Sequence, residues 1–264
     1  MRGIRRGALL LGAGVLTACA APADGGAAPA LPDRAGTASR ALECDGRPIE
    51  GGGGIYDTGL PVQDTAADAL DHFLTEESFL QVPSSGYRAE REDEDRVLFS
   101  FDVRGRTRVA FVVADGTLDV EGDEGWGVVS WARCDVSELP DEVTEALGIG
   151  VWTDPSGARV PVSAVQSRQG SEHCGWEDIT FLSVGTGRTG DRYLRDTHGE
   201  LQSYLTTTFS AAAHLPPEAM DTGYGRDGRR LWLAADRSAA YLVSTADGDD
   251  GERWPAMPEP VGCR

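Results

Sequence analysis

Cysteine is the residue type in this chain whose spacing most directly predicts covalent chemistry. Five cysteines are present, and four of them form two pairs. Cys44 and Cys134 are 90 positions apart, and Cys174 and Cys263 are 89 positions apart. In an exported chain, an even number of cysteines indicates a disulfide framework, and sequence alone leaves three connectivities open. The matched spacing favours Cys44–Cys134 and Cys174–Cys263, with cross-bridges between the pairs as the alternative.

The fifth cysteine, Cys19, ends an N-terminal segment that is typical of export. Three arginines within the first six residues precede an apolar run at 8–15, which is too short to span a bilayer. The sequence Leu-Thr-Ala-Cys at 16–19 then resembles the lipobox of bacterial lipoproteins. We predict a signal peptide at 1–18 and a lipid on Cys19 that anchors the chain to the outer face of the cell membrane. Ordinary secretion after cleavage near Ala18 is the alternative.

Two loops rich in carboxylates are weak candidates for calcium binding. Alternating carboxylates can supply oxygen ligands to Ca²⁺, but neither loop completes the EF-hand pattern. Solvated hairpin loops in an acidic protein have the same composition. No sequence pattern indicates a cofactor. The candidate ligands are Asp119, Glu121 and Asp123, with Glu124 beside them, and Asp247, Asp249 and Asp250, with Glu252 beside them.

Catalytic chemistry has only weak candidates in this sequence. The chain has four histidines, and none lies in a recognised catalytic motif. An enzyme would use His198 with Asp196, at a site between the two halves of the chain. The sequence Asp-Thr-His-Gly at 196–199 is also typical of a turn. Binding or scaffolding at the cell envelope is therefore favoured over catalysis, and a calcium-stabilised binding module is a further alternative.

Two other features have both a functional and a structural interpretation. Residues 185–190, Gly-Thr-Gly-Arg-Thr-Gly, could form an anion-binding nest, but without a strand–helix context a loop is favoured. The six tryptophans could line a carbohydrate-binding face, whereas aromatic side chains usually belong to the core. An envelope protein or a glycan is accordingly a possible partner besides the membrane.

Charge narrows the classes of partner. The formal net charge is −19, and all 24 basic residues are arginines, because the chain contains no lysine. Such a chain repels phosphate backbones and anionic headgroups, which argues against nucleic-acid binding and against a basic membrane-docking face. The absence of lysine and asparagine also indicates a gene of high G+C content.

The elements that must position these residues follow from hydrophobic periodicity. Residues 19–41 are rich in Ala, Pro and Gly and predict a flexible tether. Thr65 and Asp68 form a capping box for a helix that reaches about Leu80. A charged hairpin approach is expected at 90–96, strands at 97–103, 108–114 and 126–134, and a helix at 140–147.

The second half predicts a similar succession of strands. Residues 200–213 are ambiguous, and the spacing of Leu201, Tyr204 and Leu205 weakly favours a helix over a strand. A turn at 154–157 separates the first two predicted strands. The strands are expected at 150–153, 159–165, 176–184, 192–195, 231–235 and 239–243.

The order of these elements predicts an internal repeat. Gly86-Tyr87-Arg88 matches 223–226, the two strand pairs match in order, and both halves continue to Ala-Asp-Gly, an acidic loop, a tryptophan and a cysteine. We predict an α+β fold of two related repeats, at 42–147 and 148–264. Each would consist mainly of antiparallel hairpins with about one helix and would be closed by a disulfide.

The second half contains six short motifs: Val-Trp-Thr-Asp at 151–154, His-Cys-Gly-Trp at 173–176, Tyr-Leu-Arg-Asp at 193–196, Asp-Thr-Gly-Tyr at 221–224, Leu-Trp-Leu at 231–233 and Arg-Trp-Pro at 253–255. Together they resemble a group of actinobacterial exported proteins and lipoproteins of unknown function. The resemblance covers mainly residues 148–264. It implies an extracytoplasmic location and a disulfide role for Cys174 and Cys263, and it implies no catalytic residue.

Overall fold

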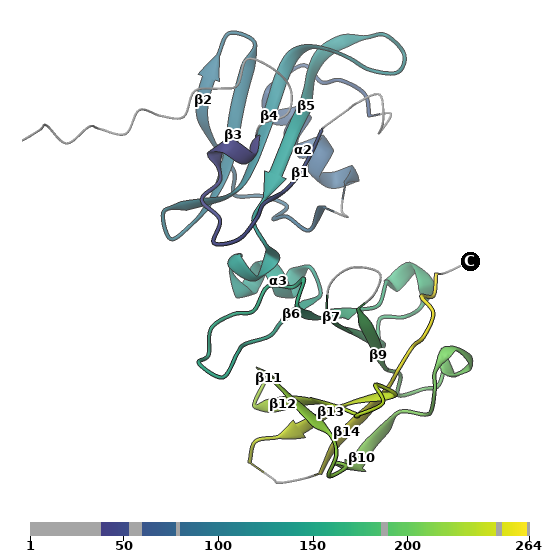
Figure 1. The fold of residues 1–264 in the computed structure, drawn as a ribbon. Coiled ribbons are helices and arrows are strands. Elements are labelled where there is room, and N and C mark those ends of the chain that lie inside the picture. The colour runs from purple at the N-terminus through teal and green to yellow at the C-terminus, as the bar shows by residue number, and fades with distance from the viewer. Residues whose placement is uncertain (1–37, 53–59, 78–79, 186–189, 247–249, 263–264) are drawn as a thin grey trace, which may run out of the picture. The chain divides into compact units, whose positions relative to one another are not determined.

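The computed structural model describes residues 38–52, 60–77, 80–185, 190–246 and 250–262. Within these ranges the chain forms three antiparallel sheets and has few helices (Figure 1). No helix in the described ranges is long and apolar enough to cross a membrane.

The first half contains a five-stranded sheet. Its strand order is β1-β5-β4-β3-β2, so the first strand pairs with the last. Arg104 and Gly105 both have positive φ, which suits the two-residue turn between β3 and β4. The three strands expected at 97–134 are confirmed, and the charged segment before them is itself a strand. The strands are β1 (Ile49–Gly52), β2 (Arg88–Asp93), β3 (Arg96–Val103), β4 (Arg106–Leu118) and β5 (Glu124–Arg133).

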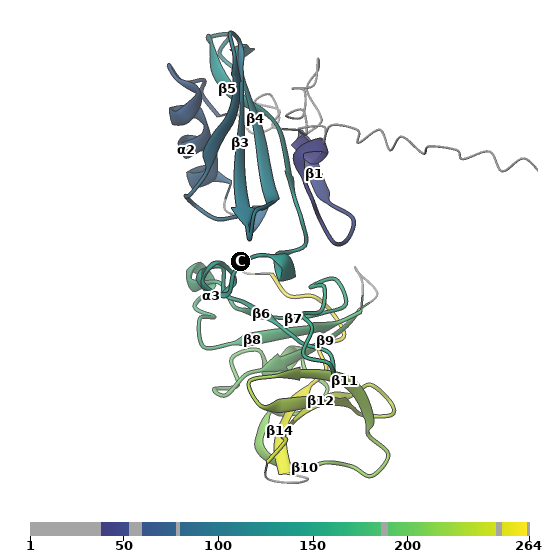
Figure 2. The ribbon, with the colours of Figure 1, turned by 90° about the vertical axis from the view of Figure 1, so that its left-hand side faces the viewer.

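Helical segments cover both faces of this sheet (Figure 2). Helix α2 (Ala66–Glu76) packs Phe73 edge-on against Phe111 of β4, with 6.0 Å between the ring centroids. The 3-10 helix at Ala38–Ala41 covers Ala110 and its neighbours on the opposite face. Because successive side chains of a strand alternate between faces, β4 contributes to both cores.

Two expected boundaries in the first half differ from the structure. The Thr65 hydroxyl accepts the Asp68 N–H, which confirms Thr65 as the N-cap, and donates to the Asp68 carboxylate instead of completing a capping box; α2 ends at Glu76 rather than near Leu80. Ala38 is fully buried, and its N–H donates to the Ser130 hydroxyl. The predicted tether therefore ends before Ala38, because small residues fit closely against the sheet.

The second half contains two sheets with a common core. One is a four-stranded meander, β6-β7-β8-β9, and the other has the order β10-β14-β13-β12-β11. Apolar side chains of both sheets form one cluster around Trp152, Tyr193 and Leu231, which makes this half a β sandwich. The strands are β6 (Ile149–Val151), β7 (Val165–Gln169), β8 (Thr180–Val184), β9 (Asp191–Arg195), β10 (Ser210–His214), β11 (Met220–Arg226), β12 (Arg229–Leu233), β13 (Ala239–Ser244) and β14 (Asp250–Pro255).

Local sequence signals were partly overridden in the second half. The helix expected at 200–213 is wrong: Gln202–Tyr204 is a single 3-10 turn, and β10 follows it. Pairing of β10 with β14 satisfies the backbone groups that a helix would have satisfied internally. The strand expected at 159–165 is also wrong, because the Pro161 carbonyl accepts the Ala164 N–H in a turn and β7 begins only at Val165.

Helix content separates the two halves. The short helix α3 (Asp141–Ala146) follows Pro140 and is succeeded by Gly148 with φ +63°, as the sequence predicts. Within the described residues after 148, all helical segments are 3-10 turns. The expectation of about one helix in each half is therefore wrong for the second, where residues 215–219 connect β10 to β11 without a helix.

Candidate functional site

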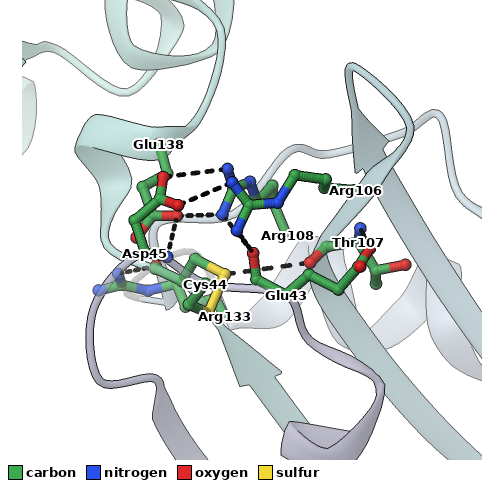
Figure 3. The surroundings of a disulfide bond; sticks show 9 residues. Glu43, Cys44, Asp45, Arg106, Thr107, Arg108, Arg133 and Glu138 are labelled. Atoms are coloured by element: carbon green, nitrogen blue, oxygen red, sulfur yellow. Dashed lines mark hydrogen bonds and ion pairs between the residues drawn. A yellow bond between two sulfur atoms is a disulfide. The ribbon is translucent and has the colours of Figure 1, made fainter. Parts of the chain in front are cut away.

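The disulfide between Cys44 and Cys134 joins the segment before β1 to the end of β5 (Figure 3). Its two Cα atoms are 5.2 Å apart, and Cys134 is fully buried. This pairing agrees with the spacing prediction. Cys174 is also disulfide-bonded, whereas Cys263 and Cys19 lie outside the described residues. The second pairing and the lipid therefore stay predictions.

An arginine network surrounds this disulfide (Figure 3). The Arg108 guanidinium forms an ion pair with the Glu138 carboxylate and donates to the Glu43 carbonyl; the side chains of Arg108 and Glu138 are only 8% and 9% exposed. Nearby, Arg106 donates to Asp45 over 2.7 Å, which lowers the pKa of that carboxyl. These contacts hold the chain before β1 against β4 and the segment after β5, so we interpret the network as structural.

The first carboxylate-rich loop uses its buried acid to form a turn. Asp119 is 5% exposed, and one carboxylate oxygen accepts the N–H groups of Glu121, Gly122 and Asp123. Burial alone raises the pKa of Asp119, but these hydrogen bonds bring it below its ordinary value. Glu121 and Asp123 are exposed.

The second carboxylate-rich loop is described only in part. Asp247 and Asp249 lie outside the described residues, and Asp250 begins β14. In the described part of the chain, no group of three or more His, Cys, Asp or Glu side chains is placed to hold a metal ion.

Asp196 and His198 are not arranged for catalysis. Asp196 is 4% exposed, and its carboxylate accepts the N–H groups of Gly199, Glu200 and Leu201. His198 is exposed in the turn that these hydrogen bonds create. The carboxylate is thus used to fold the turn, as the alternative interpretation of 196–199 expected.

The remaining sequence candidates also have structural positions. Residues 186–189 of the glycine-rich loop lie outside the described residues. Each of the six tryptophans is buried or half-buried. Trp152 and Trp254 are 1% and 4% exposed and belong to the sandwich core.

A cavity of about 240 Å³ lies at one end of the sandwich in the second half, where the inner faces change from apolar to charged. On β9 the inward position after Tyr193 is Arg195, on β12 the one before Leu231 is Arg229, and on β14 the one before Trp254 is Glu252. Side chains two positions apart on a strand share a face, so these charges continue the core layer. We call this the arginine cavity; its walls include Trp152, Ser167, Arg195, Arg226, Arg229 and Glu252.

Glu252 is the internal counterion of the arginine cavity. One of its carboxylate oxygens accepts the Trp254 indole N–H at 2.9 Å and lies 3.2 Å from Arg229 Nη1 and 3.5 Å from Arg195 Nε. The Glu252 side chain is 16% exposed, less than the 44% of Arg229 and the 37% of Arg195. The arginines therefore reach from this carboxylate towards solvent.

Arg226 crosses from one sheet to the other. Its Nη1 donates to the Ser167 hydroxyl of β7 at 2.6 Å, and its Nε lies 3.1 Å from Asp227. The guanidinium lies directly over Gly150 of β6, where an added Cβ would be 1.3 Å from Nη1. Only glycine at position 150 leaves room for this arginine.

A buried donor without a partner completes the cavity wall. The Trp152 Nε1 is shielded from solvent and makes no hydrogen bond within the described residues. Buried polar groups normally have a partner, and a missing one calls for an explanation. The three guanidinium groups and the Ser167 hydroxyl make the wall of this cavity rich in hydrogen-bond donors.

Sequence reasoning missed this cavity. A signal was present, because Arg195, Arg229 and Glu252 each stand two positions from a buried side chain on the same face of the strand, namely Tyr193, Leu231 and Trp254. The three residues belong to β9, β12 and β14, which are far apart in the sequence. The sequence alone does not indicate that these strands lie around one cavity.

Comparison of the chain with family models, with curated proteins and with solved structures gives no match in any of the three.

Proposed function

We propose that this protein is an extracytoplasmic lipoprotein that binds a ligand in the arginine cavity. The N-terminal arginines, the short apolar run and the lipobox-like sequence ending at Cys19 support export and lipid anchoring. The proposed location is the outer face of the cell membrane, where the Cys44–Cys134 disulfide is chemically compatible with oxidising surroundings.

The observation that carries the binding proposal is the charged end of an otherwise apolar sandwich. Partly buried charges are costly, and apolar residues at the same positions often stabilise a fold as well or better. Glu252, whose side chain is only 16% exposed, is therefore poorly explained by stability alone, and it holds Arg195 and Arg229 at the mouth of the cavity. Their groups suit recognition, because they offer oriented donors around a small concave space.

We also propose that the two five-stranded sheets are related repeats. Both have an order in which the first strand pairs with the fifth, followed by the fourth, third and second. The matched sequence segments lie in corresponding strands, with 97–103 in β3 and 231–233 in β12, and with Trp126 in β5 and Trp254 in β14. The four-stranded meander β6–β9 would then be an addition to the second repeat.

Anchoring is tested with Cys19→Ala. The variant is expected to leave the membrane fraction almost entirely, because a lipid on this sulfur would be the attachment. Fractionation followed by immunoblotting measures this, and mass spectrometry of the wild type is expected to show the mass of acyl chains on residue 19. Ala21→Ser is the matched control and should stay membrane-bound. A mature N-terminus at Ala21 would contradict the proposal.

Binding is tested with Gly150→Val, which places side-chain atoms where the Arg226 guanidinium lies. Native mass spectrometry of full-length protein extracted from its own membranes is expected to show a non-covalently bound small molecule. The variant should lose that molecule. Gly46→Val is the matched control, since an added Cβ there meets nothing within 4 Å. Near-ultraviolet circular dichroism verifies that both variants are folded, and equal ligand retention in both would contradict the location of the site.

A further inference from the structure

We infer that the group recognised by the arginine cavity is an oxyanion, a carboxylate or a phosphate, at the end of a larger molecule. This inference rests on the proposed binding function and names its ligand class. The chain as a whole carries a charge of −19, so a concave site in which cationic groups predominate runs against its composition.

The charge balance of the cavity favours an anion. Three guanidinium groups face two carboxylates, Glu252 and Asp227. The Asp227 side chain is 77% exposed and lies 3.1 Å from Arg226 Nε, so solvent screens much of its effect. Glu252 is in contact with Arg195 and Arg229. One positive charge therefore remains in the cavity without a counterion of its own.

The unused donors have the geometry that an oxyanion needs. Each guanidinium has five N–H donors in a planar fork, which pairs bidentately with carboxylate or phosphate. The closest contacts of the three arginines use Nε of Arg195, Nη1 and Nε of Arg226 and Nη1 of Arg229, so each guanidinium retains further N–H groups for a ligand. The Arg195 guanidinium lies 5.6 Å from the Phe209 ring centroid, and this stacking restricts its orientation.

The Trp152 side chain belongs to the cavity wall, and its indole N–H is a buried donor without a partner in the described part of the chain. An indole N–H can only donate, so a cation cannot satisfy it. Because the nitrogen is shielded from solvent, the choice of an anion rests on the three guanidinium groups and not on this donor.

The size of the cavity indicates that it binds one group rather than a whole molecule. Its 240 Å³ is less than the roughly 300–1,000 Å³ typical of sites that enclose a small molecule. A second hollow of about 380 Å³ shares Ser167, Thr180, Arg195 and Arg226 with it, and its wall also contains the carboxylates of Glu145, Glu177 and Asp178. Any part of the ligand that extends into this hollow is therefore expected to be uncharged or cationic.

The test is calorimetric titration of the full-length protein in detergent with three probes: inorganic phosphate, succinate and choline. Phosphate or succinate is expected to bind and choline is not, and the stronger of the two anions identifies the headgroup. Arg226→Gln should weaken anion binding by about tenfold or more, because a charged hydrogen-bond donor is lost. Glu252→Gln should strengthen it several-fold, because the internal counterion is removed. Arg230→Gln is the matched control, since Arg230 is adjacent to Arg229 on β12 and pairs with Asp221 outside the cavity.

Choline binding, or weaker anion binding by Glu252→Gln with its fold intact, would overturn the inference. So would the absence of heat with both anions. If the native protein nevertheless carries a small molecule that Gly150→Val loses, the binding function stands and only the ligand class is wrong.

Discussion

Replacing Cys44 and Cys134 together by alanine is expected to lower the free energy of unfolding of the first half by about 4–5 kcal/mol. The bond closes a loop with a sequence separation of 90, so its loss greatly increases the entropy of the unfolded chain. Hydrogen exchange followed by mass spectrometry in increasing urea measures this, because peptides from β3–β5 report the first half alone.

Cys19→Ala serves as the control, since it retains the bridge and should leave exchange in β3–β5 unchanged. A reductant added to the wild type should reproduce the loss in these peptides, and added to the double variant it should have no further effect there. A change below about 1 kcal/mol would show that the bridge constrains little of the unfolded chain.

Glu138→Ala is expected to cost up to about 3–5 kcal/mol, because it removes the buried carboxylate of Arg108 and leaves only the exposed Asp45 as a counterion. The same exchange measurement applies. Asp45→Ala is a matched control: it also removes a carboxylate from Arg108, but the Asp45 side chain is 64% exposed, so little change is expected.

The double variant Arg108→Met/Glu138→Leu separates the charge from the packing. Replacing both members of a buried pair with apolar residues is often neutral or stabilising, so much of the loss seen in Glu138→Ala should be recovered. If the double variant is as unstable as the sum of the single changes, the pair itself contributes the stability and the buried-charge explanation is wrong.

Elements of the fold were predictable from the sequence where the interacting residues are near one another in the chain. The N-cap at Thr65, the hairpin at β3 and β4 and the short helix α3 are determined by neighbours in sequence, and all were predicted. The segment 200–213 was not, because Leu201, Tyr204 and Leu205 mimic a helical period while β10 is held by β14, some forty residues later.

The same distinction applies to the candidate site. Asp196 and Asp119 were recognisable as carboxylates, but their hydrogen bonds to the following N–H groups show that turn formation uses them. The arginine cavity is assembled from β7, β9, β11, β12 and β14, so its residues are close only after both sheets have formed. The alternation of apolar and polar residues shows which side chains of a strand face the core. It does not show which strand of the other sheet packs against them.

The antiparallel pairing of β1 with β5, from Ile49 opposite Arg133 to Gly52 opposite Ser130, has a consequence for biogenesis. Strand β1 can pair only with β5, the last strand of this sheet to be synthesised. The sheet is therefore complete only after the whole segment between them has been made. The flanking thiols are brought together by the same pairing, so the native disulfide can form only after Cys134, 90 positions beyond Cys44, has been synthesised.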